Sequence, residues 1–275
     1  MMNQPKVSVV MGIYNCESTL AQAIDSILAQ TYTNWELILC DDGSTDGTYA
    51  LAQKYKDQYP DQIILLKNER NRKLSYTLNR CLEAATGELI ARMDGDDISC
   101  RERLERQVEF LKSHPDIQMV GSSIQYFDEA GLDEIRRFAP FPEKKDLMGK
   151  REPFCHPTIM ARKIVFDTLV GYTDLDWTVR TEDLNLYFRF FHAGFKGANI
   201  DETLYQVRVN YASLKRRTLK NRINYIRTLA HGYALLGFPK TKLVKPALVT
   251  IGKALVPAYL VMKIRQWQGR GGKKT

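Results

Sequence analysis

The stretch VSVVMGIYNCESTLAQAIDSILAQTYTNWELILCDDGSTDGT, residues 7–48, gives the clearest indication of the fold. Its first segment, within 6–14, is apolar and rich in β-branched residues, which predicts a buried strand. Apolar side chains then recur at helical spacing over 18–32, and a second apolar run follows at 35–40. A strand, a helix and another strand joined by short connections form the repeating unit of a parallel sheet.

The same alternation continues beyond this stretch. We predict further helices at 49–59, 74–86 and 100–115 and further strands at 62–68, 88–93 and 118–128. This order predicts an α/β fold with an open, doubly wound, mostly parallel sheet that is similar to a Rossmann fold. With 44% hydrophobic residues, a chain of 275 residues can bury the core that such a sheet needs.

Charge is distributed unevenly along the chain. Residues 1–202 carry 24 basic and 32 acidic side chains, whereas 203–275 carry 16 basic and no acidic ones. Five cysteines without a C-x-x-C pair predict reduced thiols in a cytosolic protein, and no signal peptide is visible. The parts that we expect are a body at 1–213, with halves at 1–128 and 129–213, and a basic helical extension at 214–275.

Polar side chains follow three of the predicted strands at the point where each strand ends. Because ligands bind beyond the carboxyl ends of parallel strands, we expect these side chains to line one crevice. Clustered carboxylates there can hold a hard divalent cation, Mg²⁺ or Mn²⁺, which also binds phosphates. Each motif alone is equally typical of a solvated turn or a helix cap. The motifs are Tyr14-Asn15, Asp41-Asp42, and the acidic cluster of Asp94, Asp96 and Asp97.

In this order, the motifs resemble those of family 2 glycosyltransferases of the GT-A fold, and the resemblance covers about residues 5–213. Besides residues 7–48, it is carried by AATGELIARMDGDDISCRERLERQVEFL and CHPTIMARKIV…VGYTDLDWTVRTEDLNLYFRFFHAGFKGANIDETLYQVR. It implies a nucleotide-sugar-binding half followed by a half that carries the acceptor site and the base. Such enzymes transfer a sugar from a nucleoside-diphosphate sugar to an acceptor hydroxyl, with inversion at the anomeric carbon.

The resemblance also implies which residues bind the donor. Tyr14, with Asn15 beside it, would line the base pocket. Asp42 would contact the base or ribose, and Asp41 would support that turn. Lys73 stands where such enzymes often contact the base or a phosphate, as does the arginine before it, although a solvated charge is the alternative for both.

In the D-x-D position of the family, Asp94 would lie near the ribose and diphosphate, and Asp96 would be the direct metal ligand. Asp97 is expected to cap the next helix. His156, in FCHPTIM, could approach the diphosphate or the metal, although a lone histidine is more often packed and hydrogen-bonded. A Mn²⁺ or Mg²⁺ ion would stabilise the charge on the departing diphosphate.

The base is expected in the second half, within TVRTEDLNLYFRFF. A single-step displacement needs a carboxylate within hydrogen-bond reach of the acceptor hydroxyl. The resemblance assigns Asp183 as this base and Glu182 as a neighbour that orients the acceptor or the loop. An acidic pair favoured at a helix N-terminus is compatible with that role. The E-D-x-D of the family ends here in Asn185, and Trp177 could stack on an acceptor sugar. No Q-x-x-R-W motif follows, so we expect one sugar to be added per encounter.

The basic extension predicts two helical segments. The first, 213–237, would present an apolar stripe of Leu219, Ile223, Ile226, Ala230 and Tyr233. The second, 246–264, is largely apolar, but Lys253 and Pro257 argue against a transmembrane helix. We expect the extension to lie on an anionic membrane surface. Packing on the acidic body is the second interpretation, and nucleic acid, for which no aromatic binding pattern is present, is the third.

These expectations combine into one hypothesis. The protein would be a metal-dependent enzyme that uses a UDP-sugar, with GDP- and dTDP-sugars as open alternatives. Its acceptor would be a lipid-linked saccharide in bacterial surface polysaccharide, O-antigen or lipopolysaccharide assembly, on the cytoplasmic face of the membrane. Two alternatives are a nucleotidyltransferase, which usually has a Gly- and Arg-rich loop where this chain reads GIYNCEST, and a non-catalytic sugar-nucleotide-binding protein at the membrane.

Overall fold

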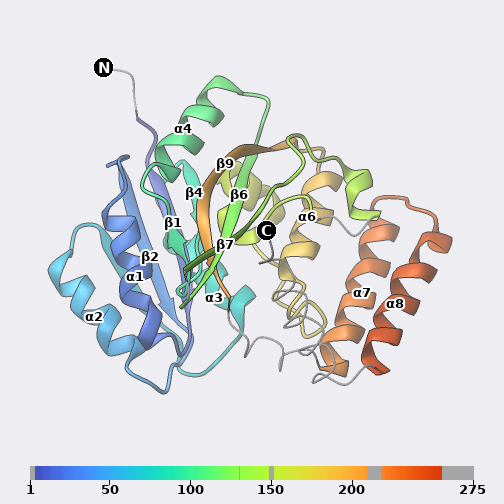
Figure 1. The fold of residues 1–275 in the computed structure, drawn as a ribbon, viewed down its shortest axis with the longest axis horizontal. Helices are drawn as coiled ribbons and strands as arrows, with labels where there is room; N and C mark the ends of the chain where they lie inside the picture. The colour runs from blue at the N-terminus through green and yellow to red at the C-terminus, as the bar shows by residue number, and fades with distance from the viewer. Residues whose placement is uncertain (1–3, 130, 149–151, 210–217, 256–275) are drawn as a thin grey trace, which may run out of the picture.

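The computed structural model describes residues 4–129, 131–148, 152–209 and 218–255. It has one mixed sheet with helices on both faces (Figure 1). The strands are β1 (Val7–Ile13), β2 (Trp35–Asp41), β3 (Ile63–Lys67), β4 (Leu89–Arg92), β5 (Ile98–Ser99), β6 (Met119–Asp128), β7 (Gly131–Arg136), β8 (Met160–Arg162) and β9 (Gly197–Arg208). The helices are α1 (Glu17–Leu28), α2 (Thr48–Gln58), α3 (Leu74–Ala84), α4 (Arg103–Ser113), α5 (Lys163–Leu169), α6 (Glu182–His192), α7 (Leu219–Leu235) and α8 (Val244–Leu255). Short 3₁₀ helices lie at η1 (Lys144–Met148), η2 (His156–Thr158) and η4 (Lys240–Leu243).

The strand order is β3-β2-β1-β4-β8-β6-β9-β5, with β7 paired to β6. Strands β3, β2, β1 and β4 are parallel, and β9 is parallel to β6. Strand β8 runs antiparallel between β4 and β6, and thus joins the two halves into one sheet. The prediction of a doubly wound, mostly parallel α/β sheet is confirmed. Because β1, β2 and β4 are parallel neighbours, the loops that follow them open at the same edge of the sheet.

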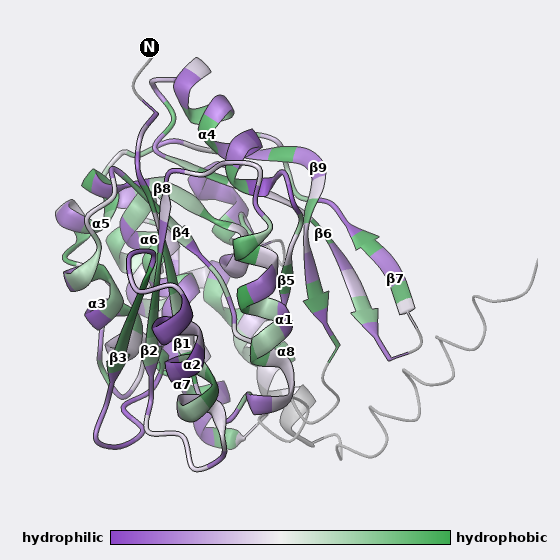
Figure 2. Cartoon of the chain, turned by 90° about the vertical axis from the view of Figure 1, so that its left-hand side faces the viewer, coloured by the Kyte–Doolittle hydropathy of each residue, from purple (hydrophilic) through white to green (hydrophobic). Residues whose placement is uncertain are grey.

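Strands β1 to β3 are apolar because helices cover both of their faces, as their green colour in Figure 2 shows. Side chains along β1 alternate between the two layers. Val9 and Met11 belong to the core layer that includes Ile24 of α1, whereas Val10 packs in the layer that includes Leu78 of α3. This is the packing that the apolar runs of the first stretch predict.

Two predicted helix boundaries in the body differ from the structure by three residues or more. Helix α1 ends at Leu28 rather than at residue 32, and α4 starts at Arg103 rather than at residue 100. The intervening residues are held by contacts between the two segments. The Gln30 side-chain amide donates to the Cys100 carbonyl oxygen (2.8 Å), and Ser99 pairs with Tyr205 of β9. These contacts lie between residues far apart in the sequence, so helical periodicity could not show them.

The apolar stripe predicted for the first extension helix is not the face through which α7 packs on the body. Of its five residues only Tyr233 is buried, while Leu219 and Ile223 are exposed. Helix α7 instead packs on α6 through small and polar side chains. Gly232 lies against the Phe188 ring, and the hydroxyl groups of Thr228 and Thr181 are hydrogen-bonded at 2.7 Å. Residues 213–217 of the predicted helix lie outside the described residues.

Helix α8 packs against α7, so that α6, α7 and α8 lie side by side in Figure 1. It begins at Val244, two residues before the predicted start, and the predicted segment 256–264 lies outside the described residues. No helix within the described parts of the chain is long and apolar enough to cross a membrane. The predicted boundary between body and extension, at 213–214, also falls outside the described residues.

Candidate active site

The loops that follow β1 and β2 are joined into one structure. The Asn15 side-chain oxygen accepts a hydrogen bond from the Thr45 backbone N–H (2.9 Å), and its own backbone N–H donates to the Ser44 hydroxyl (3.0 Å). Asn15 adopts a left-handed conformation with φ of 47°, which asparagine tolerates better than most residues. Tyr14 is 46% exposed beside this junction, so its ring is accessible to a ligand.

The carboxylate of Asp42 organises the next loop along the sheet edge. It accepts hydrogen bonds from the backbone N–H groups of Arg72 (2.7 Å) and Lys73 (3.0 Å) and from the Asn68 amide (2.8 Å). This accounts for the conformation of Lys73, whose φ is 74°. The predicted contact of Asp42 with a base or ribose is untested. The structure shows that Asp42 holds the loop on which Arg72 and Lys73 lie.

Asp41 lies beneath the same turn. It is fully buried, and its Oδ2 accepts a hydrogen bond from the Ser44 backbone N–H (3.1 Å). Among the described residues nothing donates to its Oδ1. Asp41 is therefore positioned to support this turn, which is the role that the resemblance implies.

Arg72 and Lys73 are exposed at the rim. The Arg72 guanidinium lies 4.2 Å from the Tyr76 ring centroid, and the Lys73 ammonium donates to the Asn71 side chain (2.8 Å). Both cations remain accessible to an anionic ligand such as a phosphate.

The acidic cluster forms a compact group beyond the end of β4. Asp94, Asp96 and Asp97 each offer a carboxylate oxygen, and these oxygens all lie within 4.8 Å of one another. The structure therefore brings together the three carboxylates that the D-x-D-D pattern suggested. Their oxygen ligands fit the preference of Mg²⁺ and Mn²⁺.

Asp94 is held by a partner that the sequence did not suggest. Arg92, which is only 3% exposed, donates hydrogen bonds to both carboxylate oxygens of Asp94. The distance from Nη1 to Oδ2 is 2.6 Å. The Asp94 backbone N–H donates to the Tyr205 hydroxyl (3.1 Å). A bidentate pair fixes a carboxylate in position, and each of its oxygens keeps a second acceptor site. Within the cluster, Asp94 is thus neutralised by its arginine.

The predicted capping role of Asp97 is wrong. Its side chain is buried and accepts a hydrogen bond from the Arg208 backbone N–H (2.8 Å), and α4 starts only at Arg103. Burial raises the pKa of Asp97 well above its usual range, and the charges of Asp94 and Asp96 add to this. Asp97 therefore ties the acidic cluster to β9, and an opposing positive charge would relieve the repulsion within the cluster.

Glu182 and Asp183 form the first turn of α6, where the helix dipole favours negative charge. Asp183 Oδ1 accepts a hydrogen bond from the Leu184 backbone N–H (2.7 Å). Burial, with a contribution from Glu182, raises the pKa of Asp183 to about 7, although Arg92 opposes the shift. A carboxylate with such a pKa is well suited to accept a proton near neutral pH. Arg92, which pairs with Asp94, is thus close enough to act on the charge of Asp183 as well.

His156 is not a member of the compact acidic cluster. It is buried in η2, and its Nε2 lies 2.9 Å from the Tyr172 hydroxyl. Burial and the nearby Arg92 lower its pKa well below the usual value, so the ring is neutral. The metal-ligand prediction for His156 is untested, and these contacts match the packed alternative.

Trp177 is half-buried before α6, and its ring centroid lies 5.3 Å from that of His231 on α7. This ring contact joins Trp177, in the body, to His231, in the extension. Its predicted contact with an acceptor sugar is untested.

Sequence reasoning missed Arg92 and Arg208. Arg208 is connected to the acidic cluster at two points, because its backbone N–H donates to Asp97 and its Nε donates to the Asp96 carbonyl oxygen (2.9 Å). A signal for Arg92 was present, since a charged residue interrupts the apolar run LIARM two positions before Asp94. A buried arginine needs an anionic partner, and Asp94 was the nearest in sequence.

Comparisons with known proteins agree with this geometry. The family model described as glycosyl transferase family 2 matches residues 8–170. The chain is 52% identical over 214 residues to the putative glycosyltransferase EpsE of Bacillus subtilis, covering 78% of this chain and 77% of that one. It is 29% identical over 210 residues to the Escherichia coli protein WfaP, named a UDP-Glc:alpha-D-GlcNAc-diphosphoundecaprenol beta-1,3-glucosyltransferase, with 75% and 79% covered.

Solved structures show the same fold. S. aureus TarS in complex with UDP superposes with a TM-score of 0.63 at 19% identity, covering 84% of this chain and 69% of that one. The mannosyltransferase PcManGT of Pyrobaculum calidifontis, solved with GDP-Man and Mn²⁺, gives a TM-score of 0.64 at 17% identity, with 97% and 81% covered. With the GT-A fold, the family model and the similarity to EpsE, the chain belongs to glycosyl transferase family 2 and is a glycosyltransferase.

Proposed function

We propose that this glycosyltransferase transfers a sugar, with inversion, from a nucleoside-diphosphate sugar to a saccharide hydroxyl, with the help of a divalent cation. One observation carries the proposal. A compact acidic cluster lies at the carboxyl end of β4, in the same region as a half-buried aspartate whose pKa is raised to about 7. The cluster supplies what a cation and a diphosphate need, and Asp183 supplies what an attacking hydroxyl needs.

The donor set fits a hard cation, because all three members of the acidic cluster are carboxylates. Asp96 would hold the Mn²⁺ or Mg²⁺ ion, with Asp94 beside it towards the ribose and diphosphate. When bound, the ion would neutralise charge that develops on the departing nucleoside diphosphate. Arg92 keeps the Asp94 carboxylate in place, and Arg208 keeps the loop of Asp96 in place.

Asp183 would act as the base. In an inverting single-step displacement, the acceptor oxygen attacks the anomeric carbon while the bond to the diphosphate breaks. The hydroxyl proton passes to the Asp183 carboxylate. Glu182, beside it, keeps the pKa of Asp183 raised and orients the acceptor or the loop.

The nucleotide would lie across the joined loops after β1, β2 and β3. Tyr14 and Asn15 would line the base pocket, and Asp41 and Asp42 would hold the loops from below. Lys73 would face the base or a phosphate. UDP is the nucleotide that we propose, since WfaP is named for UDP-Glc and TarS was solved with UDP, although PcManGT was solved with GDP-Man.

We further propose a lipid-linked saccharide acceptor in bacterial polysaccharide assembly, reached from the cytoplasmic face of the membrane. The name of WfaP specifies such an acceptor for that protein. In this chain, α7 and α8 expose Leu219, Ile223, Val244 and Leu248, and no acidic residue occurs after Glu202. Exposed apolar side chains among lysines and arginines fit an anionic membrane surface. Trp177 would contact the acceptor sugar.

Donor hydrolysis tests this proposal. Purified protein would be incubated with UDP-, GDP- and dTDP-sugars and Mn²⁺, and the release of free nucleoside diphosphate would be recorded with and without EDTA. We expect slow release from one donor, lost on addition of EDTA and in the Asp96→Asn variant. Release that survives both EDTA and Asp96→Asn would refute the metal site.

A further inference from the structure

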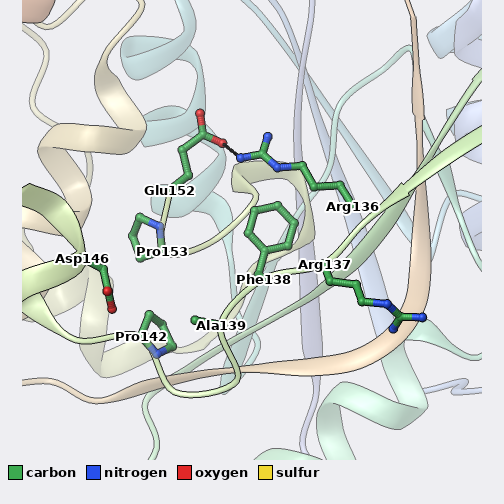
Figure 3. A pocket seen from close by; sticks show the side chains of 8 residues that line it. All are labelled: Arg136, Arg137, Phe138, Ala139, Pro142, Asp146, Glu152 and Pro153. Carbon is green, nitrogen blue, oxygen red and sulfur yellow. Dashed lines mark ion pairs between the residues drawn. The ribbon is translucent and has the colours of Figure 1, made fainter. Parts of the chain in front are cut away.

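A cavity of about 450 Å³ lies outside the donor site described above. It opens between the segment that follows β7 and the segment that leads into η2 (Figure 3). Its volume falls in the range of small-molecule sites, about 300–1,000 Å³. Its lining residues are Arg136, Arg137, Phe138, Ala139, Pro142, Asp146, Glu152 and Pro153.

The walls of the cavity are fixed to each other and to the sheet. Asn199 of β9, which is buried, donates from its side-chain amide to the carbonyl oxygens of Ala139 (2.7 Å) and Pro153 (2.9 Å). Its backbone N–H donates to the Pro140 carbonyl oxygen (2.7 Å). One buried asparagine thus holds both walls, so the cavity is formed before any ligand arrives.

The lining is chemically balanced. The lining carries two arginines and two carboxylates, those of Asp146 and Glu152. Arg136 is paired with Glu152 (3.0 Å), and Arg137 is paired with Asp201, which is not a lining residue. An anionic ligand such as a nucleoside diphosphate would have to compete with these partners. A neutral, polar ligand can instead share the outward donors and acceptors of the ion pairs without displacing them.

An aromatic ring lies among these polar groups. The Arg136 guanidinium is 4.8 Å from the Phe138 ring centroid, and Figure 3 shows the Arg136–Glu152 pair beside that ring. Pro142 and Pro153 add further apolar surface. A pyranose ring has an apolar C–H face and polar hydroxyl edges. The Phe138 ring and the prolines suit the apolar face of such a sugar, and the paired charges suit its hydroxyl groups.

The cavity wall is also packed against α6, the helix that carries the proposed base. Glu152 is among the charges that raise the pKa of Asp183, after burial and Glu182. Phe154, which follows Pro153, packs on Tyr187 and Phe190 of α6 with ring centroids 5.4 and 6.1 Å apart. Asp183 lies in the first turn of that same helix. The cavity wall and the base are therefore parts of one packed unit.

We propose that this cavity binds a saccharide unit of the acceptor, stacked on Phe138 and hydrogen-bonded to the Arg136–Glu152 pair. This inference rests on the proposed function, because it assigns the acceptor side of the same reaction. It predicts that part of the acceptor specificity lies in residues 136–146 and 152–153, outside the motifs that are proposed to bind the donor.

The test is binding of free saccharides to the full chain, without donor or metal. The probes are methyl glycosides and disaccharides of glucose, galactose and N-acetylglucosamine, with inorganic pyrophosphate as the anionic probe, observed by saturation-transfer NMR. We expect at least one saccharide to bind, with affinity at least tenfold weaker in Phe138→Ala and in Glu152→Gln. The matched controls, Phe141→Ala and Glu143→Gln on the same segment, lie outside the cavity and should bind within twofold of wild type.

Three outcomes would overturn the inference. These are no saccharide binding across the panel, equal loss in Phe138→Ala and Phe141→Ala, and binding of pyrophosphate in place of saccharides. Glu152→Gln keeps the test decisive if Phe138→Ala does not fold. Donor hydrolysis by the wild-type protein separates the two proposals. If donor hydrolysis is absent but saccharide binding that depends on Phe138 is present, the proposed function is wrong and the saccharide site is supported. If it is present without such binding, the opposite holds.

Discussion

Single residues in this site owe their properties to neighbours far away in the sequence. Asp183 could be assigned from the E-D motif, but its raised pKa follows from burial and from Glu182. Asp94 and Asp96 could be assigned from D-x-D, yet the pairing of Asp94 with the buried Arg92 required the structure. Sequence reasoning proposed the candidate active groups because their residue types and motifs are distinctive. It missed the supporting groups because arginine has many ordinary roles on protein surfaces.

The pH dependence of transfer follows from Asp183. Its pKa is raised to about 7, and only the carboxylate form can accept the hydroxyl proton. We expect the rate at saturating donor and acceptor to fall about tenfold for each pH unit below about 7. A pH series of initial rates would measure this, with UDP binding recorded at each pH as the control. A rate that stays constant from pH 5.5 to 8 would contradict the assignment of Asp183 as the base.

Ionisation of the Asp183 carboxyl group lowers the stability of the folded protein. Its pKa is 3.8 when unperturbed and higher in the folded protein, so ionisation opposes folding at pH values above both. This destabilisation is absent below about pH 4, increases between about pH 4 and 7, and reaches its full size above about pH 7. We expect Asp183→Asn to stabilise the fold by ~1–3 kcal/mol at pH 8. In thermal melts, Asp183→Asn should have a higher melting temperature than wild type at pH 8 but not at pH 4. An equal increase at both pH values would show that the stabilisation does not come from removing the charge of Asp183.

At the scale of elements, the regular part of the fold followed from sequence and the irregular part did not. The strand–helix–strand unit of β1, α1 and β2 was predictable because apolar periodicity reflects burial directly. The packing of α7 was not. Its buried face consists of Asn224, Thr228, Leu229, Gly232 and Tyr233, so polar and small residues lie where a hydropathy pattern expects apolar ones. Their partners on α6 and in the loop before it complete the contact.

The close contact of α7 with α6 depends on a missing side chain. A Cβ at Gly232 would lie 2.1 Å from the Phe188 ring, whereas a Cβ at Gly252 of α8 would meet no atom of the described residues within 4 Å. We expect Gly232→Ala to destabilise the protein by ~1–3 kcal/mol through overpacking. Gly252→Ala should instead be neutral or stabilising, by up to about 1 kcal/mol, because alanine favours helices. Urea denaturation of both variants would measure the difference. Equal effects would show that α7 does not pack as described.

At the scale of the whole molecule, we propose that the acidic body carries out the transfer and that the basic extension binds the membrane. The proposed donor and acceptor sites belong to the body, and α7 and α8, beside α6 in Figure 1, add exposed apolar and basic residues. The charge division was visible in the sequence, because it needs only counting. The orientation of the exposed apolar residues was not, since it depends on which face of α7 the body covers.

Membrane binding would follow from this surface. We expect the full chain to sediment with vesicles that contain phosphatidylglycerol, less with pure phosphatidylcholine, and less at higher salt, since each engaged basic residue contributes ~1 kcal/mol. Leu248→Glu should weaken vesicle binding. Leu132→Glu on β7 is the matched control, because both leucines are 63% exposed. If both variants bind as wild type does, this surface is not the one that contacts the membrane.

The central claim is that the acidic cluster holds the cation and the nucleotide while Asp183 takes the proton. The most direct measurement compares Asp96→Asn with Asp183→Asn by calorimetric titration of UDP with and without Mn²⁺, together with transfer rates. We predict that Asp96→Asn loses the Mn²⁺-dependent part of UDP binding, and that Asp183→Asn keeps this binding but loses transfer by a factor of at least about 100. If Asp183→Asn kept transfer, or Asp96→Asn kept Mn²⁺-dependent binding, the division of roles between the two groups would be wrong.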